Sequence, residues 1–150
     1  MDTEKTIRNY LPQIIHMSLA TCVENKPWIC EVHYVFDNEL NFYFRSTPQR
    51  RHSLEIAKNS HVAGNIVTQH FLGQKVRGVY FEGVAERLVN VNEDHIAYKL
   101  YCERFGTNED ILAEAEKDTG HGFYKIIVNK FVLFDGHESS PSRKHELSWK

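Results

Sequence analysis

The chain has 150 residues, and its 18 Lys and Arg against 20 Asp and Glu give a formal charge of −2 with nine His neutral. This length suits one domain, and a composition of 41% hydrophobic and 25% charged residues excludes disordered, collagenous and low-complexity proteins. The small net charge gives no bulk attraction to nucleic acid or to an anionic membrane, so any anion site has to be local.

The cysteine count and the start of the chain indicate a compartment. There are three Cys, and the opening MDTEKT lacks the basic and apolar regions of a secretory signal. An odd, small number of Cys argues against a disulfide framework, so we expect a cytoplasmic protein. No stretch approaches the ~18 consecutive apolar residues that a membrane helix requires, so we expect no membrane-spanning helix.

The first part of the chain predicts a short helix followed by an antiparallel meander. Apolar residues recur at helical spacing from Ile7 to Ile14, and Pro12 is expected to end or kink this helix. Aromatic and β-branched residues then predict strands, with turns between them at 25–27 and 37–38. The predicted strands cover residues 17–23, 28–36 and 40–47.

A helix is expected directly after the third strand. Thr47 can act as its N-cap, and Pro48 suits the first helical position because the missing N–H costs nothing there. This helix is predicted to run to about residue 59. Cys22 and Cys30 flank the first turn of the meander and are interpreted as buried thiols, near each other across the hairpin.

The second part of the chain alternates strands and helices. Gly78 and Gly83 lie within a long predicted strand and indicate a bulge, a bend or the close approach of a ligand. The final residues, 139–150, are polar apart from Leu147 and Trp149, so we expect this tail to fray unless Trp149 docks. The predicted elements are strands over 61–68 and 75–89, a helix that Asn92 caps and Gly106 stops, an acidic helix over 108–117, and a strand over 123–134.

Together these elements predict a mainly β domain covering residues 1–150. Six strands with mostly hairpin-scale connections and flanking helices favour a small antiparallel barrel over a parallel doubly wound sheet.

An arginine-rich helix start is the most informative candidate site. Arg45, Ser46 and Thr47 end a predicted strand, and Arg50 and Arg51 fall in the first turn of the next helix. Free backbone N–H groups and the helix dipole favour an anion there. Cations at this position oppose the dipole by ~0.3–1 kcal/mol each, so the cluster indicates a bound anion such as phosphate.

The alternative is that these Arg side chains are solvated or paired with Glu55 or another surface carboxylate. Other site types have less support. The Gly78 to Gly83 segment has the glycine spacing of a P-loop but no Lys, no Rossmann fingerprint follows a strand, and no Ser–His–acid set can be argued. The nine His form no metal-binding motif, so we expect no metal.

Two segments resemble a known family. The run Phe42-Tyr43-Phe44-Arg45-Ser46-Thr47 followed by Pro48-Gln49-Arg50-Arg51-His52 resembles the flavin-binding core of the pyridoxamine 5′-phosphate oxidase-like split barrels. The run Arg77-Gly78-Val79-Tyr80-Phe81-Glu82-Gly83 is similar to the small bacterial YhbP-like branch of that superfamily. The resemblance covers roughly residues 3–135.

The resemblance implies a six-stranded split β-barrel and a homodimer with FMN in two clefts at the dimer interface. It assigns the FMN phosphate to Arg45, Ser46, Thr47, Arg50 and Arg51. It also places Gln74, Val76 and Arg77 at the isoalloxazine ring, and Trp149 where a late aromatic residue of the partner subunit closes the cleft. The chain ends in Glu146-Leu147-Ser148-Trp149-Lys150 and lacks the Arg-Leu-x-Pro stretch of the oxidase proper, so pyridoxamine phosphate oxidation is not expected.

We therefore expect an FMN-dependent oxidoreductase that acts on a small molecule, in which the flavin carries the redox chemistry. One alternative is a flavin- or haem-binding module that stores or senses its ligand without turnover. Another is a nucleic-acid-binding barrel that uses the same Arg residues with exposed aromatic residues, although the net charge of −2 counts against it.

Overall fold

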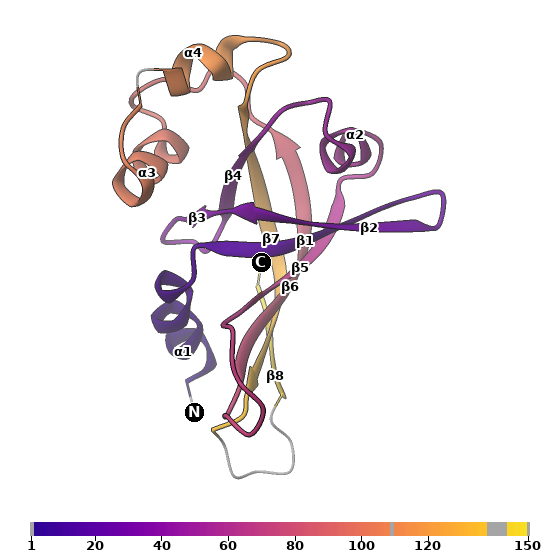
Figure 1. Ribbon diagram of the computed structural model, residues 1–150, viewed down its shortest axis with the longest axis vertical. Helices are drawn as coiled ribbons and strands as arrows, with labels where there is room; N and C mark the ends of the chain where they lie inside the picture. Colours follow the sequence, from indigo (N-terminus) through magenta and orange to yellow (C-terminus); the bar gives the residue numbers. More distant parts are fainter. Residues whose placement is uncertain (1, 109, 138–143, 150) are drawn as a thin grey trace.

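The computed structural model describes residues 2–108, 110–137 and 144–149. One curled, antiparallel eight-stranded sheet dominates it, with helices at its ends and flanks (Figure 1). The helices are α1 (Thr3–Tyr10), the 3-10 turn η1 (Leu11–Gln13), α2 (Arg51–Lys58), α3 (Ile96–Phe105) and α4 (Asp110–Glu116). The strands are β1 (His16–Val23), β2 (Lys26–His33), β3 (Val35–Phe36), β4 (Phe42–Ser46), β5 (His61–Val67), β6 (Arg77–Arg87), β7 (Gly122–Asp135) and β8 (Lys144–Ser148).

The strand order is β2-β1-β5-β6-β7-β4-β3, and β8 pairs with β7 beside this path. Every pairing is antiparallel, which confirms the predicted mainly β fold with flanking helices. The sheet has eight strands where six were predicted. Two local features account for the difference.

The first is a break at Tyr34, which divides the predicted strand over 28–36 into β2 and β3. The Tyr34 backbone N–H donates to the carbonyl of Ile15 at 3.1 Å, and its hydroxyl donates to the carbonyl of Leu11 at 2.7 Å. The ring is fully buried, so it draws the backbone toward the core at this point.

The second is β8, which lies in the tail that was expected to fray unless Trp149 docks, and Trp149 does dock on its own chain. Its residues pair with β7, from Lys130 opposite Ser148 to Phe134 opposite Lys144. Its inward Leu147 packs on the core, which explains why this short segment is ordered. Residues 138–143 and 150, which include part of the predicted tail, lie outside the described residues.

Both predicted helix starts differ by a few residues. The N-cap of α2 is Arg50, with extended backbone (φ −63°, ψ 146°), so the prediction of Thr47 as the cap was wrong. The Arg50 N–H donates to the Thr47 carbonyl at 3.4 Å, which turns the chain once more before the helix begins. For α3 the N-cap is His95, whose Nδ1 accepts from the Ala97 N–H at 3.1 Å, where Asn92 was predicted. The predicted stop at Gly106 is confirmed, with φ +90°.

The bulge predicted in the long strand is confirmed. The register between β6 and β7 shifts between Glu82 and Gly83. A Cβ atom at Gly83 would lie 2.4 Å from the Ile127 carbonyl oxygen, so only glycine lets the two backbones approach here.

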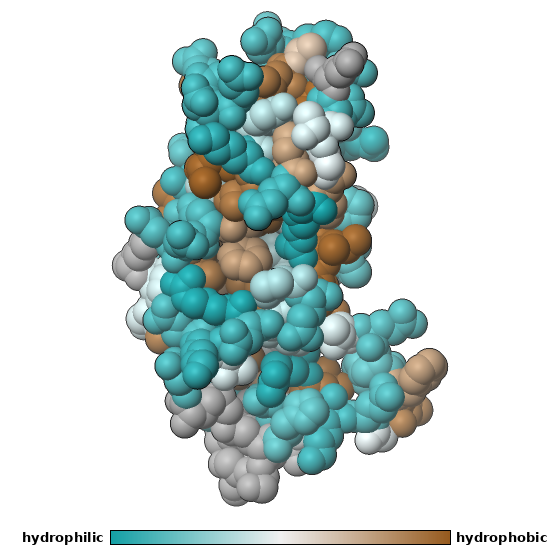
Figure 2. Space-filling view, turned by 90° about the vertical axis from the view of Figure 1, so that its left-hand side faces the viewer, coloured by the Kyte–Doolittle hydropathy of each residue, from teal (hydrophilic) through white to brown (hydrophobic). Residues whose placement is uncertain are grey.

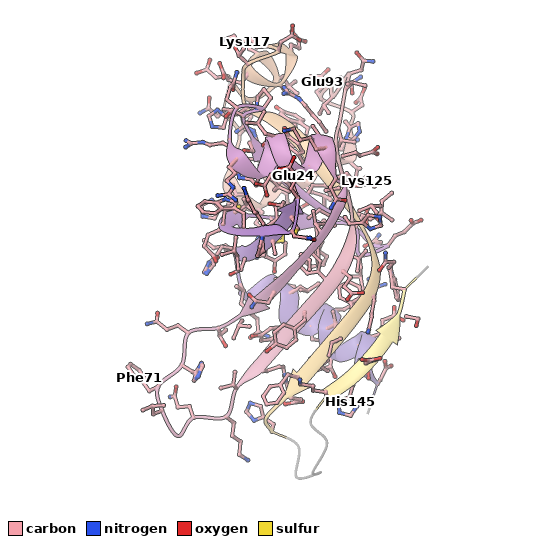
Figure 3. The ribbon with its side chains drawn as sticks, turned by 90° about the vertical axis from the view of Figure 1, so that its right-hand side faces the viewer. Glu24, Phe71, Glu93, Lys117, Lys125 and His145 are labelled. Carbon is pink, nitrogen blue, oxygen red and sulfur yellow. The ribbon has the colours of Figure 1, made fainter. Side chains whose placement is uncertain are left out.

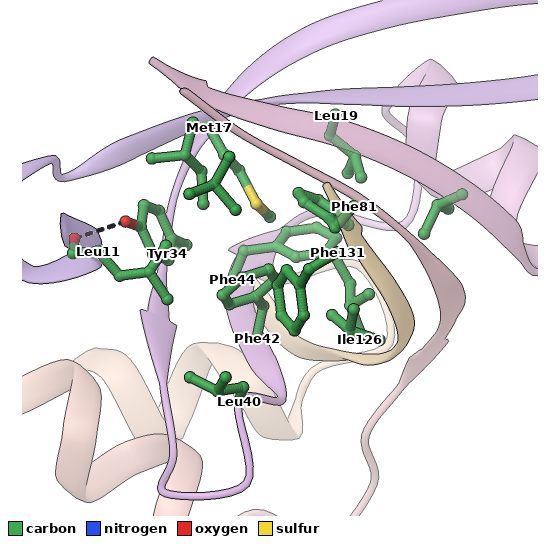
Figure 4. Packing of buried hydrophobic residues seen from close by; sticks show 14 of the residues in the cluster. Leu11, Met17, Leu19, Tyr34, Leu40, Phe42, Phe44, Phe81, Ile126 and Phe131 are labelled. Atoms are coloured by element: carbon green, nitrogen blue, oxygen red, sulfur yellow. Dashed lines mark hydrogen bonds between the residues drawn. The ribbon is translucent and has the colours of Figure 1, made fainter. Parts of the chain in front are cut away.

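The core lies inside the curl of the sheet and is rich in aromatic residues (Figure 4). Phe42 is at its centre and makes edge contacts with Phe81 at 5.0 Å, Tyr34 at 5.4 Å and Phe131 at 6.0 Å between ring centroids. A second, smaller cluster packs α3 and α4 against β4 and β7.

The turn predicted at 37–38 is built around one carboxylate. Asp37 Oδ1 accepts from the backbone N–H groups of Glu39 and Asn41 at 2.9 Å each, and Tyr43 donates its hydroxyl to Oδ2 at 2.9 Å. Burial raises the pKa of Asp37, but these hydrogen bonds outweigh burial and hold the pKa below its ordinary value of 3.8.

The loop between β5 and β6 projects from the end of the molecule opposite α2 (Figures 1 and 3). It is closed by the Phe71 N–H, which donates to Gln74 Oε1 at 2.8 Å. Phe71 and Leu72 are 77% and 102% exposed. Figure 3 shows Phe71 at the tip of this loop, and Figure 2 shows apolar surface at the end of the protrusion. Among the described residues, none of the helices has the length and apolar character needed to cross a membrane.

Candidate functional site

A cleft of about 570 Å³ opens where the end of β4 meets the start of α2. β2 forms one wall, and α3 and the segment before β7 contribute to the other. We call it the arginine cleft. Its lining residues are Trp28, Cys30, Glu31, Val32, His33, Arg45, Ser46, Arg50, Arg51, His52, Tyr101 and His121.

Arg45 enters the cleft from the end of β4, and its guanidinium lies beside two aromatic rings that meet edge-on. Its guanidinium carbon lies 5.3 Å from the ring centroid of Tyr101 and 5.6 Å from that of Phe123. Its Nε is buried and has no hydrogen-bond partner among the described residues. A buried donor without a partner is costly, and Arg45 Nε shares this state with Arg77 Nε at the other end of the molecule.

Arg50 and Arg51 are neighbours in sequence, but only Arg51 has its charge paired with a carboxylate. Arg51 Nε bonds Glu55 Oε2 at 2.7 Å, and its guanidinium lies 4.3 Å over the Trp28 ring. The pairing with Glu55 raised as an alternative therefore holds for Arg51. Arg50 is exposed and has no ion pair within the described parts of the chain.

Glu55 is held from two sides. Besides Arg51, Thr21 donates its hydroxyl to Glu55 Oε1 at 2.8 Å from the neighbouring strand β1. The hydrogen bonds from Arg51 and Thr21 keep the pKa of Glu55 below its ordinary value, so this carboxylate stays ionised and neutralises part of the positive charge of the cleft.

Two buried residues, His52 in the lining of the cleft and Ser53 behind it, were not identified as site residues from the sequence. His52 is 8% exposed and its Nε2 lies 2.8 Å from Ser46 Oγ, and Ser53 donates its hydroxyl to Ser46 Oγ at 3.3 Å. Burial, and then the positive charge of Arg50, lower the pKa of His52. The signal was available, because His52 and Ile56 are four residues apart and share the inward face of the predicted helix.

The donor set of the arginine cleft fits a phosphate monoester. Three Arg residues line it, and Glu31 is the one carboxylate among its described lining residues. The N-terminus of α2 has no side-chain cap, so its first backbone N–H groups remain available to an anion. Trp28 and Tyr101 add aromatic surface beside these donors.

The structure brings together four of the five residues predicted to hold a phosphate. Arg45, Ser46, Arg50 and Arg51 all line the cleft. Thr47 lies beside them in the chain but is not a lining residue, and its carbonyl accepts from Arg50.

The predicted ring-contacting residues lie elsewhere in the same chain. Gln74 and Val76 belong to the projecting loop between β5 and β6, and Arg77 begins β6 at that end of the molecule. Arg77 pairs with Asp135 at 3.0 Å, and its carbonyl accepts the Tyr10 hydroxyl at 2.5 Å. One chain therefore does not bring them to the arginine cleft.

Trp149 is likewise outside the cleft and packs on its own chain. Its indole Nε1 donates to the Glu39 carbonyl at 2.7 Å, and its ring meets Phe131 edge-on at 6.1 Å between centroids. The guanidinium carbon of Arg8 lies 5.7 Å from its ring centroid. Its assignment to a partner's cleft stays a prediction.

All three cysteines are free and partly buried. Cys22 lies opposite Pro27 and Cys30 opposite Leu19 in the β1–β2 hairpin, so the two thiols are not directly opposite each other. Within residues 2–108, 110–137 and 144–149, no group of three or more His, Cys, Asp or Glu residues is placed to hold a metal ion.

Comparison with known proteins identifies the family. The family model described as pyridoxamine 5′-phosphate oxidase matches residues 3–133. The "UPF0306 protein YhbP" of Salmonella arizonae is 30% identical over 106 residues, which cover 70% of this chain and 71% of that protein.

Solved structures share the fold at low sequence identity. The heme storage protein HutZ of Vibrio cholerae aligns with a TM-score of 0.64 and 18% identity, covering 85% of this chain and 91% of that one. A FAD-binding protein of Mesorhizobium loti aligns with a TM-score of 0.64 and 16% identity, covering 86% and 90%. The family match, the YhbP relative and these folds agree, and the chain belongs to the pyridoxamine 5′-phosphate oxidase-like superfamily, in its YhbP-like branch.

Proposed function

We propose that this protein binds FMN and that the arginine cleft holds the phosphate of the cofactor. The observation that carries the proposal is the buried Arg45 Nε, which has no partner among the described residues and lies in a cleft shared with Arg50 and Arg51. A phosphate supplies the acceptor oxygens that these donors lack. Family membership and the FAD-binding protein of the same fold support a flavin as the molecule that carries this phosphate.

Bound FMN would supply electron transfer, so the protein is proposed to be an oxidoreductase for a small molecule. The chain's own part is to bind and orient the cofactor. Arg45 and Arg50 would hold the phosphate, while Trp28 and Tyr101 present aromatic surface along the same cleft.

The proposal includes a homodimer with FMN at the interface. Its support is the separation between the arginine cleft near α2 and the loop that carries Gln74 and Val76, which lie at opposite ends of one chain (Figure 1). A partner subunit would bring its Gln74, Val76 and Arg77 to the cleft, and it would also cover Phe71 and Leu72 at the loop tip.

Titration with FMN and with riboflavin tests the proposed function. The two ligands share the ring system and differ by the phosphate, so FMN should bind more tightly by at least tenfold if two charge-assisted hydrogen bonds form. Quenching of flavin fluorescence measures both affinities. A chain that leaves FMN fluorescence unchanged at any concentration, and stays colourless, would overturn the proposal.

Haem is a second candidate, because the same fold occurs in the heme storage protein HutZ and in a heme binding protein of Mycobacterium smegmatis that aligns with a TM-score of 0.69 and 15% identity. A Soret band after addition of hemin to the purified protein would favour haem. For a flavin-loaded protein, anaerobic photoreduction followed by added acceptors separates an enzyme from a storage or sensing module, since a module shows no productive turnover with any of the acceptors.

A further inference from the structure

The floor of the arginine cleft holds a compact polar cluster. Ser46 Oγ lies 2.8 Å from His52 Nε2, and Ser53 donates its hydroxyl to the same oxygen at 3.3 Å. Ser46 is 5% exposed and His52 8%, and both line the cleft. The Ser46 hydroxyl is therefore the shared partner of two buried side chains, directly beside the Arg residues.

A serine hydroxyl has one proton to donate and two lone pairs to accept with. If His52 Nε2 carries no proton, it accepts a hydrogen bond from the Ser46 hydroxyl, and Ser46 then has no proton left to donate to a ligand in the cleft. If Nε2 carries a proton, Ser46 accepts from both His52 and Ser53. Its own proton is then free, because the alternative acceptor, the Thr47 carbonyl, lies at 3.4 Å, which is a weak contact.

We propose that His52 is a positioning residue of the phosphate site, whose Nε2–H turns the Ser46 hydroxyl toward a phosphate oxygen held by Arg45 and Arg50. This inference rests on the proposed function, since it concerns the same cleft. Ser46 is already assigned to the phosphate by the family resemblance, and the inference adds a residue that controls whether the Ser46 hydroxyl is available to donate. With a phosphate bound, the Ser46 oxygen would use both lone pairs and its proton, so the buried cluster would be fully satisfied.

The charges around His52 favour this arrangement when an anion is present. Burial and Arg50 lower the pKa of His52, so the free protein holds a neutral imidazole near pH 7 and the choice is between its two tautomers. A phosphate beside Arg50 offsets the positive charge that opposes a proton on the ring. The groups that face the cleft with His52 are Cys30, Glu31 and His33 from β2, Arg45 from β4, Arg50 and Arg51 at the start of α2, Tyr101 from α3 and His121 before β7.

The first test is the protonation state of Nε2 in the unmodified protein. Nitrogen-15 NMR of the His52 imidazole distinguishes a protonated from an unprotonated ring nitrogen, with and without FMN. We expect Nε2 to be protonated in the complex. An unprotonated Nε2 in the FMN complex would overturn the inference.

The second test distinguishes a positioning role of His52 from a purely structural one. His52→Leu should weaken FMN by about tenfold and leave riboflavin unchanged, because one charge-assisted hydrogen bond to the phosphate is lost. His52→Gln, whose amide offers an N–H donor, should restore most of the loss. In a Ser46→Ala background His52→Leu should have no further effect on FMN. Equal, additive losses in that background would show that His52 does not act through Ser46.

Controls keep the outcomes distinct. His61→Leu changes an exposed imidazole on β5, outside the cleft, and should alter neither affinity. Urea unfolding of each variant reports whether the fold is kept. If the wild-type chain binds no FMN, the proposed function fails, and inorganic phosphate becomes the probe. A protonated His52 Nε2 with phosphate bound would support the anion site alone, and an unprotonated Nε2 with phosphate bound would overturn it.

Discussion

Arg50 and Arg51 are adjacent, yet their removal should have different consequences. Arg51 already bonds Glu55 at 2.7 Å and lies over Trp28, whereas Arg50 is exposed and has no ion pair among the described residues. Arg50→Ala removes an uncompensated charge from the arginine cleft. The loss of one charge-assisted hydrogen bond to a phosphate costs about 1.5–3 kcal/mol, which corresponds to FMN affinity weaker by about 10- to 150-fold.

Arg51→Ala should weaken FMN less, because Glu55 neutralises part of the charge that is removed. By the same reasoning Glu55→Gln should strengthen FMN binding, since it releases Arg51 toward the phosphate. Stability should hardly change with Arg50→Ala, within about 0.5 kcal/mol, because the side chain is exposed and makes no capping bond to α2.

The assay is flavin fluorescence titration of the three variants with FMN and with riboflavin, at one pH and ionic strength. Riboflavin is the control, because the substitution of a residue that holds only the phosphate should leave the affinity for riboflavin unchanged. The reasoning would be refuted if Arg50→Ala weakened both flavins equally, or if Arg51→Ala had the larger effect on FMN alone.

Three further predictions concern the fold and the dimer. Gly83→Ala places a methyl group 2.4 Å from the Ile127 carbonyl oxygen and should destabilise the protein by about 1–3 kcal/mol in urea unfolding; an unchanged midpoint would show that the bulge adapts. Burial raises the pKa of Asp37, but hydrogen bonds hold this pKa below 3.8 in the folded protein. The contribution of Asp37 to stability is therefore present above pH 3.8 and is lost as the pH falls through the lower pKa of the folded state. Urea midpoints measured on acidification should fall less steeply in Asp37→Asn than in the wild type, and parallel curves would contradict this. Replacing Phe71 and Leu72 by Ser should weaken the proposed dimer in sedimentation velocity, and an unchanged dimer would show that the loop tip lies outside the interface.

Much of the fold could be predicted from local sequence, because strand alternation and turn residues act over short distances. The break at Tyr34 could not, since it depends on the carbonyls of Leu11 and Ile15, which only the folded chain brings near. The same is true of β8, whose polar residues are ordered by pairing with β7 and by the packing of Leu147.

In the candidate site, too, some features follow from local sequence and others depend on distant segments. The placement of Arg45 and Arg50 near a helix start follows from the order of strand and helix along the chain, and the bond between Arg51 and Glu55 follows from a spacing of four residues. The contacts of Arg45 with Tyr101 and Phe123 join distant segments, so the unpartnered Nε had no signal in the sequence.

The position of β7 near the end of the chain governs when the arginine cleft can form. Phe123, at its start, pairs with Arg45 across the sheet and lies under the Arg45 guanidinium. A nascent chain that has been synthesised only as far as α3 already contains all three Arg residues, but Arg45 has no Phe123 beneath it and β4 lacks its main neighbour. The surroundings of Arg45 in the arginine cleft are therefore complete only after the start of β7 has been synthesised and the sheet has closed.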